Sequence, residues 1–143
     1  MSVKQISVFL DDRPGALAAL AEVLKDNDID MRAVSVADAR DFGIVRMIVD
    51  DNAAAVAVME DAGYVCSLLD VLAVGVEDSP GGFCAVLRAL GDMDVNINYS
   101  YTMTTHNKDK AFLIARVSDI GRASDELEAG GWECLKEADI PNV

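Results

Sequence analysis

The sequence predicts an α+β fold made of two tandem βαββαβ units, and three observations support this prediction. Short runs in which apolar and polar residues alternate are typical of strands with one buried face. Between these runs lie segments whose apolar residues recur at helical spacing. The whole pattern occurs twice within the 143 residues, first at an offset of 66 positions and further along at an offset of 68.

The internal repeat is visible as identical residues at these separations. At the first offset Pro14 matches Pro80, and at the second offset Cys66 matches Cys134. The two extra residues fall between positions 38 and 110, where a hairpin tip is the natural place for an insertion. Turn residues and helix faces match together, which indicates two copies of one supersecondary unit.

In the first half, the elements follow one another clearly. The first strand carries apolar residues at Ile6, Val8 and Leu10. An apolar helix face follows at Leu17, Leu20, Ala21 and Leu24. Pro14 fits the first helical turn, because an N–H group has no intrahelical partner there. Two strands, a second helix closed by a left-handed glycine cap at Gly63 and a fourth strand complete the half, over residues 31–37, 42–50, 52–62 and 64–68.

The second half repeats this order of elements. Its first strand runs through Leu72, Val74 and Val76, and its helix face is formed by Phe83, Val86, Leu87 and Leu90. The remaining elements are expected over residues 95–103, 110–118, 123–130 and 132–136. Residues 67–71 join the halves without a Gly/Ser-rich linker, so we expect two rigidly placed domains, 1–68 and 69–143.

The order of elements in each half is that of the ferredoxin-like split βαβ unit, an antiparallel sheet with two helices on one face. A unit of half this chain is small for an independent domain. We therefore expect the two sheets to lie side by side as one eight-stranded sheet with helices on one face. Such pairing would hide an edge strand of each half from aggregation.

The composition narrows the classes of partner. The net charge is −13, from 25 acidic and 12 basic residues, which disfavours nucleic acid and anionic membranes as partners. The N-terminal stretch MSVKQISVFL lacks the features of a signal peptide, and no apolar run reaches membrane-spanning length. The three cysteines lack metal-type spacing, which points to reduced thiols and a cytoplasmic protein.

The loop before the first helix of each half has the chemistry of a binding site. A helix N-terminus offers unpaired N–H groups and a partial positive charge, which favour a carboxylate or phosphate. Gly15 and Gly81 allow a ligand to approach the backbone, and Asp12 and Asp78 could attract an ammonium group. A free amino acid carries both charges. The alternative is structural, because Asp12 and Asp78 could cap the helices while the glycines only shape turns.

The two loops also resemble a known motif. The segment DRPGAL, residues 12–17, and its copy DSPGGF, residues 78–83, resemble the [DE]-x-P-G-x-[LF] pattern of ACT domains. These domains are small amino-acid-sensing modules that occur on metabolic enzymes and alone. The segments 28–30 and 94–96 also resemble the family, and the likeness covers residues 3–137. The resemblance implies a stand-alone tandem ACT protein without a catalytic domain.

In ACT pairs the modules lie side by side through their second strands, and an effector sits between the first loop of one and the second strand of the other. Carried over to this chain, the resemblance implies ligand-binding residues in both loops and in the facing strands. Separately, the motif DFGIVR, residues 41–46, has a glycine beside a strand start that could let a ligand approach, which adds Phe42 and Gly43 as candidates. Together the candidates are Asp11, Asp12, Arg13, Pro14, Gly15, Ala16, Leu17, Ser35, Phe42, Gly43, Asp78, Ser79, Pro80, Gly81, Gly82, Phe83, Tyr99 and Tyr101. Two alternatives remain open: the tyrosines could serve strand packing alone, and Gly43 could mark a hairpin bulge.

The sequence offers no constellation typical of catalysis. The single histidine, His106, lies at the expected hairpin tip, and no zinc, redox or phosphate-binding motif occurs. We therefore expect neither an enzyme nor a bound metal or cofactor. The expected function is an amino-acid-binding regulatory protein, a homodimer that acts on a metabolic enzyme or regulator, with the ligand held at the interface between the repeats. The alternatives are a ligand-free interaction subunit of a metabolic enzyme and a small ferredoxin-like enzyme.

Overall fold

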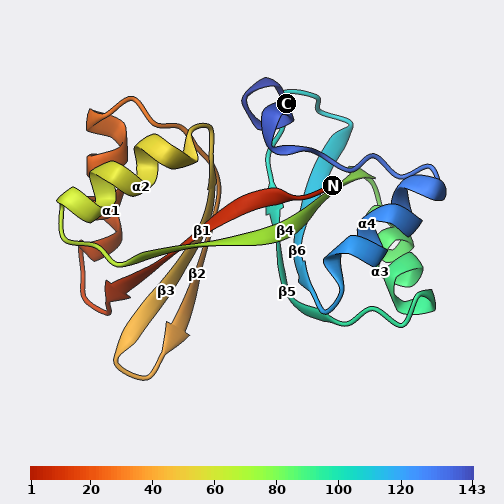
Figure 1. Ribbon diagram of the computed structural model, residues 1–143, viewed down its shortest axis with the longest axis horizontal. Helices are drawn as coiled ribbons and strands as arrows, with labels where there is room; N and C mark the ends of the chain where they lie inside the picture. The colour runs from red at the N-terminus through yellow and green to blue at the C-terminus, as the bar shows by residue number, and fades with distance from the viewer. The chain divides into compact units, whose positions relative to one another are not determined.

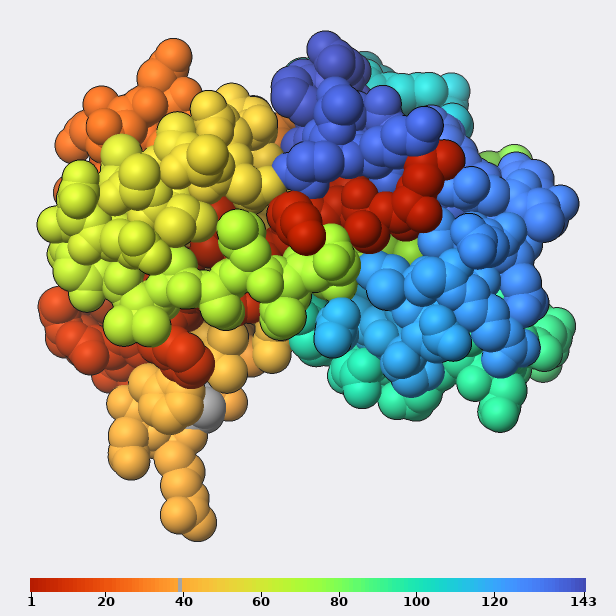
Figure 2. Space-filling view, viewed as in Figure 1, coloured from red at the N-terminus to blue at the C-terminus, as the bar shows by residue number. Residues whose placement is uncertain are grey.

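The structure is a computed structural model that describes residues 1–143, apart from the side chain of Ala39 (Figures 1 and 2). The chain divides into two compact units. We call Lys4–Leu69 the first unit, and Met1–Val3 together with Asp70–Val143 the second unit. Each unit is described by itself.

The first unit has an antiparallel sheet covered on one face by two helices (Figure 1). Its elements are β1 (Val3–Asp11), α1 (Ala16–Asp26), β2 (Met31–Ala39), β3 (Phe42–Val49), α2 (Asn52–Asp61) and the first part of β4 (Cys66–Glu77). The strand order is β2-β3-β1-β4, which makes β2 an edge strand. Figure 2 shows that the β2–β3 hairpin projects from the unit.

The strand register fixes which side chains form the core of the first unit. Ile6 lies opposite Met47 and Val8 lies opposite Val45, so one face of β1 and β3 is continuously apolar. Leu20 and Leu24 of α1 pack onto this face, and all these side chains are fully buried or nearly so. The helix face predicted from apolar spacing is therefore the face that builds the core.

The second unit repeats this layout. Its further elements are α3 (Gly82–Asp92), β5 (Ile97–Met103), β6 (Lys110–Val117), α4 (Ile120–Ala129) and a 3-10 helix (Glu137–Asn142). The strand order is β4-β6-β5, so β5 takes the edge position that β2 has in the first unit. Leu72, Val74, Leu113 and Ala115 form the apolar sheet face under α3 and α4.

Matching turns end the helices of both units. Asp28 after α1 and Asp94 after α3 both adopt the left-handed region, with φ of 57° and 56°. Gly63 and Gly131 after the second helices have φ of 91° and 88°. The glycine cap expected at Gly63 is confirmed, as are the α+β class and the repeated βαββαβ order.

The number of strands differs from the prediction: the described residues form six strands rather than eight. The strands expected over 64–68 and 72–76 are one strand, β4, and the joining segment expected over 67–71 lies inside it. The segment SLLDV, residues 67–71, contains neither glycine nor proline, and the strand runs through it without a break. The boundary expected after residue 68 stays a prediction.

The last predicted strand, over residues 132–136, is reduced to a single bridge between Cys134 and Val74. The N–H of Gly75 donates to the oxygen of Glu133 at 2.8 Å, and the N–H of Leu135 donates to Ala73 at 2.9 Å. The chain then turns into the 3-10 helix, which contains Pro141 and so cannot continue a ladder of hydrogen bonds. Every helix in the described part of the chain is too short or too polar to span a lipid bilayer.

Candidate functional site

Each of the two predicted loops ends at a glycine that starts a helix. Gly15 is the N-cap of α1 with φ of 82°, and Gly81 is the N-cap of α3 with φ of 92°. These left-handed values favour glycine strongly over residues with a Cβ. Both helices begin two residues after the proline, so Pro14 and Pro80 precede the N-cap instead of lying in the first helical turn.

The four long helices differ in how their N-termini are capped. α1 and α3 have no side-chain cap, whereas α2 is capped by Asp51 and α4 by Asp119, each of which accepts a backbone N–H. The structural alternative for Asp12 and Asp78 is therefore wrong, because neither carboxylate caps the helix that follows it. The N-termini of α1 and α3 are thus the two that keep their anion-attracting N–H groups uncapped by a side chain.

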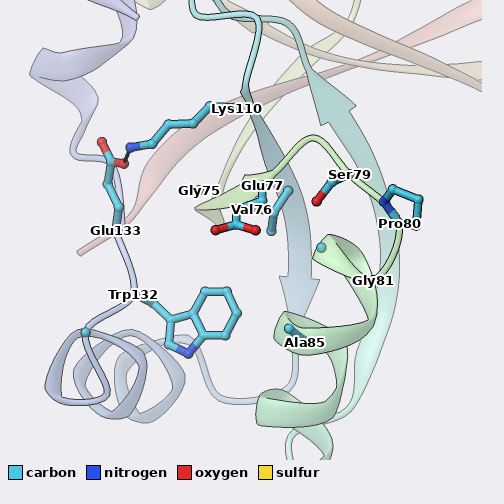
Figure 3. Close-up of a pocket in the computed structure, with 12 residues that line it drawn as sticks. Gly75, Val76, Glu77, Ser79, Pro80, Gly81, Ala85, Lys110, Trp132 and Glu133 are labelled. Carbon is cyan, nitrogen blue, oxygen red and sulfur yellow. Dashed lines mark hydrogen bonds and ion pairs between the residues drawn. The ribbon is translucent and has the colours of Figure 1, made fainter.

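A cavity of about 540 Å³ lies beside the loop of the second unit (Figure 3). The end of β4 forms one wall, the start of α3 a second wall, and the turn after α4 a third. The lining residues are Gly75, Val76, Glu77, Ser79, Pro80, Gly81, Gly82, Ala85, Lys110, Gly131, Trp132 and Glu133. Small-molecule sites are concave and mostly apolar with a few polar groups, and this cavity fits that description.

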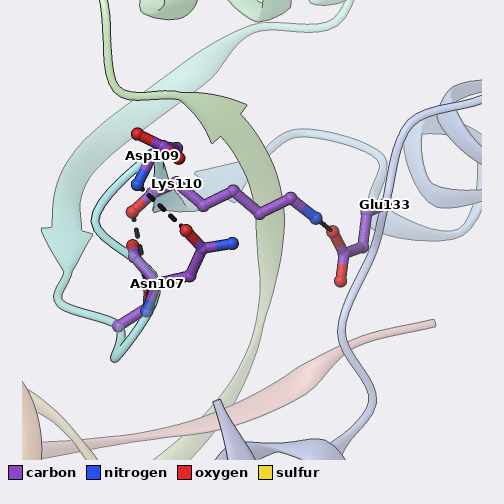
Figure 4. Close-up of polar contacts among 5 residues, drawn as sticks. Asn107, Asp109, Lys110 and Glu133 are labelled. Carbon is purple, nitrogen blue, oxygen red and sulfur yellow. Dashed lines mark hydrogen bonds and ion pairs between the residues drawn. The ribbon is translucent and has the colours of Figure 1, made fainter.

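An ion pair closes one side of this cavity (Figures 3 and 4). The ammonium of Lys110 contacts the carboxylate of Glu133. The hairpin tip fixes the backbone of Lys110, because its N–H donates to the oxygen of Asn107 at 3.2 Å. Asn107 in turn accepts the N–H of Asp109 through its side-chain oxygen at 3.0 Å. Lys110 is therefore held at its backbone by the hairpin tip and at its ammonium by Glu133.

The first unit has a smaller cavity, of about 300 Å³, at the corresponding place. Phe9, Leu10, Asp11, Arg13, Ala16, Ala62, Gly63, Tyr64 and Val65 line it. Its loop carries an ion pair, because the guanidinium Nε of Arg13 lies 3.5 Å from the carboxylate of Asp11. The two cavities lie at equivalent places in the two repeats, because Asp11 corresponds to Glu77 and Tyr64 corresponds to Trp132.

The structure brings some of the predicted loop residues together and leaves others apart. Asp11, Arg13 and Ala16 line the first cavity, and Ser79, Pro80, Gly81 and Gly82 line the second. The remaining loop residues lie outside both linings and are exposed, namely Asp12, Pro14, Gly15, Leu17, Asp78 and Phe83.

The predicted strand residues lie away from these cavities. Ser35 is on β2, while Tyr99 and Tyr101 are on β5, and all three are half-buried on the edge strand of their own unit. In the ladder between β5 and β6, Tyr99 lies opposite Arg116 and Tyr101 opposite Ile114. Their expected place opposite a loop of the other repeat stays a prediction.

Phe42 and Gly43 lie at the start of β3. The ring of Phe42 meets the ring of Phe9 edge to face, with centroids 5.5 Å apart, and both side chains are exposed. Gly43 is buried and keeps regular register with Asp38 and Leu10, so the bulge interpretation is wrong. The irregularity of this hairpin falls between Met31 and Ala33 instead.

Sequence reasoning missed several residues that line the second cavity, above all Lys110, Trp132 and Glu133. A signal existed for Trp132, because both repeats place an aromatic residue directly after the left-handed glycine that ends the second helix. Lys110 and Glu133 gave no signal, since surface charges are common and their pairing depends on the tertiary fold.

Two of the three thiols, Cys66 and Cys134, have raised pKa values. Burial raises the pKa of Cys134 to about 11, with a smaller contribution from Glu128, and burial also raises the pKa of Cys66. These thiols therefore stay protonated at neutral pH. In the described part of the chain, no three His, Cys, Asp or Glu residues gather in a way that could hold a metal ion.

Comparison with protein families gives a match over almost the whole chain. The model of the ACT domain pair matches residues 1–141. No curated protein matches.

Several solved structures are similar to this chain over both of its repeats. Protein BT0572 from Bacteroides thetaiotaomicron is 29% identical with a TM-score of 0.91, over 100% of this chain and 98% of that chain. The regulatory subunit of aspartate kinase from Thermus thermophilus, in its ligand-free form, is 18% identical with a TM-score of 0.66, over 88% of each chain. The corresponding subunit from Thermus flavus is 18% identical with a TM-score of 0.61, also over 88% of each chain. The two subunits share the fold with this chain.

Proposed function

Because the chain belongs to the ACT domain pair family, we propose that it is a regulatory protein whose β1–α1 and β4–α3 loops bind a free amino acid. ACT domains regulate rather than catalyse, and two structural neighbours are regulatory subunits of aspartate kinase. The proposal assigns no catalytic step and no cofactor to this chain.

One observation carries the proposal. Each loop ends in a helix N-terminus without a side-chain cap, and each lies beside a cavity that contains a loop carboxylate. The α-carboxylate of an amino acid matches uncapped N–H groups, and its ammonium matches Asp11 or Glu77. The same pairing in both repeats favours a ligand with two opposite charges over a simple anion.

Regulation follows if the ligand has different affinities for two states of the protein. We propose that those states differ in how the chain engages a metabolic enzyme, a regulator or a second copy of itself. The resemblance supports contributions from Ser35, Tyr99 and Tyr101 of the edge strands to ligand binding between the repeats. The three free thiols support a reducing, cytoplasmic setting.

A thermal-shift screen of the twenty amino acids tests the proposal. At 100 times the Kd, one occupied site adds about 2.7 kcal/mol, which corresponds to a shift of several degrees for a chain of this size. The screen is repeated on Gly15→Val and Gly81→Val, whose side chains would obstruct the approach to the helix N-termini. Gly91→Val, on the exposed side of α3, controls for the effect of valine itself.

The proposal requires at least one amino acid to raise the melting temperature and one loop variant to abolish that rise. If no amino acid changes the melting temperature and calorimetric titration detects no heat of binding, the ligand-free interaction subunit becomes the better account.

A further inference from the structure

The two cavities lie at equivalent places in the two repeats but have different side chains. This difference predicts which cavity binds the ligand more tightly. The second cavity, at about 540 Å³, is larger than the first, at about 300 Å³. Where the first cavity has Phe9 and Ala16, the second has Gly75 and Gly82. Two side chains that occupy space in the first unit are therefore missing from the second.

The backbone conformation of the second loop requires glycine at position 82. A Cβ on Gly82 would overlap with the backbone oxygen of Glu77, whereas the first unit holds a buried alanine, Ala16, at the equivalent place. α3 therefore begins directly against the backbone of Glu77. This contact sets Glu77 beside the helix N-terminus, with its carboxylate directed into the cavity (Figure 3).

The charges of the two cavities also differ. In the first unit Arg13 lies 3.5 Å from Asp11 and offsets its charge. The residue equivalent to Arg13 is Ser79, so the second loop supplies no cation to Glu77. Lys110 faces Glu77 across the β4–β6 ladder, but its ammonium contacts Glu133. Two carboxylates and one ammonium leave the second cavity with one net negative charge.

The apolar part of the second cavity lies opposite these charges. The indole of Trp132 points toward Ala85 of α3 and forms a flat wall (Figure 3). Val76 adds a further apolar surface. A ligand that fits would place an ammonium at Glu77, an anion at the α3 N-terminus and an apolar group against Trp132.

Building on the proposed function, we infer that the second cavity is the selective site and that it binds an α-amino acid with a large apolar side chain. Glu77 holds the ammonium group, the first turn of α3 holds the carboxylate, and Trp132 contacts the side chain. The first cavity, narrowed by Phe9 and neutralised by Arg13, binds the same ligand more weakly.

Calorimetric titration of the full chain with defined probes tests this inference. L-Phenylalanine and L-leucine are compared with L-alanine, and L-phenylalanine is compared with 3-phenylpropionate, which lacks the ammonium. We expect at least tenfold tighter binding of the large amino acids than of alanine, and no measurable binding of 3-phenylpropionate. Glu77→Gln should weaken the binding of L-phenylalanine at least tenfold, because it removes a charged hydrogen bond.

The pseudo-symmetry of the chain supplies matched controls. Asp11→Asn and Tyr64→Leu make the same changes at the equivalent positions of the first unit and should alter the tighter Kd less than twofold. Trp132→Leu should reduce the preference for phenylalanine over alanine to below threefold. Melting curves of each variant without ligand establish that it is folded.

The outcomes separate this inference from the proposed function. If an amino acid binds but Asp11→Asn weakens it more than Glu77→Gln, or alanine binds as tightly as phenylalanine, the inference is wrong while the proposed function stands. If none of the twenty amino acids binds the unmodified chain, both are wrong.

Discussion

Gly82 lies so close to Glu77 that a Cβ on this glycine would overlap with the backbone oxygen of Glu77. This contact joins the start of α3 to the end of β4 and thereby shapes the loop of the second unit. The equivalent position in the first unit is Ala16, so the start of α1 has room for a Cβ where the start of α3 has none.

Gly82→Ala should therefore destabilise the protein. The added methyl group forces the loop or the start of α3 to shift, which typically costs about 1–3 kcal/mol. Urea unfolding of the variant measures this loss. Ala16→Gly is the reciprocal change and should cost less, because it creates no overlap and removes only a buried methyl group. Equal stability of Gly82→Ala and the unmodified chain would contradict the described contact.

A second prediction concerns the left-handed N-cap of α3. Gly81→Ala should lower stability by about 1 kcal/mol, because φ of 92° is strained for a residue with a Cβ. Gly91→Ala should instead raise stability by about 0.5–1 kcal/mol, since this glycine lies inside α3 with open space around it. Thermal unfolding of the two variants should give shifts of opposite sign.

The caps of the helices provide a third prediction. Asp51→Ala and Asp119→Ala should each cost about 1 kcal/mol, because each carboxylate accepts an N–H at the start of its helix. Asp12→Ala and Asp78→Ala should leave the unfolding free energy almost unchanged, since neither residue caps a helix. Chemical denaturation of the four variants distinguishes the two groups, and a loss at Asp78 equal to that at Asp119 would restore the capping interpretation.

The raised pKa of Cys134 leads to a fourth prediction. Because burial raises this pKa to about 11 from the usual 9.0, the folded chain keeps its proton after the unfolded chain has lost it. The contribution of Cys134 to stability is therefore complete below pH 9 and is lost as the pH rises toward 11. Cys134→Ala should flatten the fall in melting temperature across this range. At neutral pH, alkylation should modify the exposed Cys84 well before Cys134.

Local sequence patterns were sufficient for most of the fold. Alternation and helical spacing placed the helices and most strands, because each pattern reflects burial on one face of one element. They misjudged β4, where two predicted strands are one, since periodicity carries no signal for a junction inside a continuous strand. They also overestimated the last strand, where only Cys134 bridges to β4 before the chain turns into the 3-10 helix at Glu137.

The candidate site was less accessible from sequence. The loop glycines were found because the Pro-Gly pair recurs in both repeats, and the structure adds that both glycines are left-handed. Trp132, Lys110 and Glu133 lie far along the chain from the loop, and they reach the cavity only through sheet pairing and the turn after α4. Such convergence is a tertiary property, and an acidic sequence offers many carboxylates among which Glu133 does not stand out.

The unbroken course of β4 from Cys66 to Glu77 determines whether the two repeats can be separated from one another. Tandem modules are usually separable by proteolysis at an exposed joining segment, but here the midpoint of the chain is hydrogen-bonded strand. A gene split between residues 69 and 70 would give each product a severed strand with an open edge, which invites aggregation. We therefore expect limited proteolysis not to release either repeat as an intact, folded fragment.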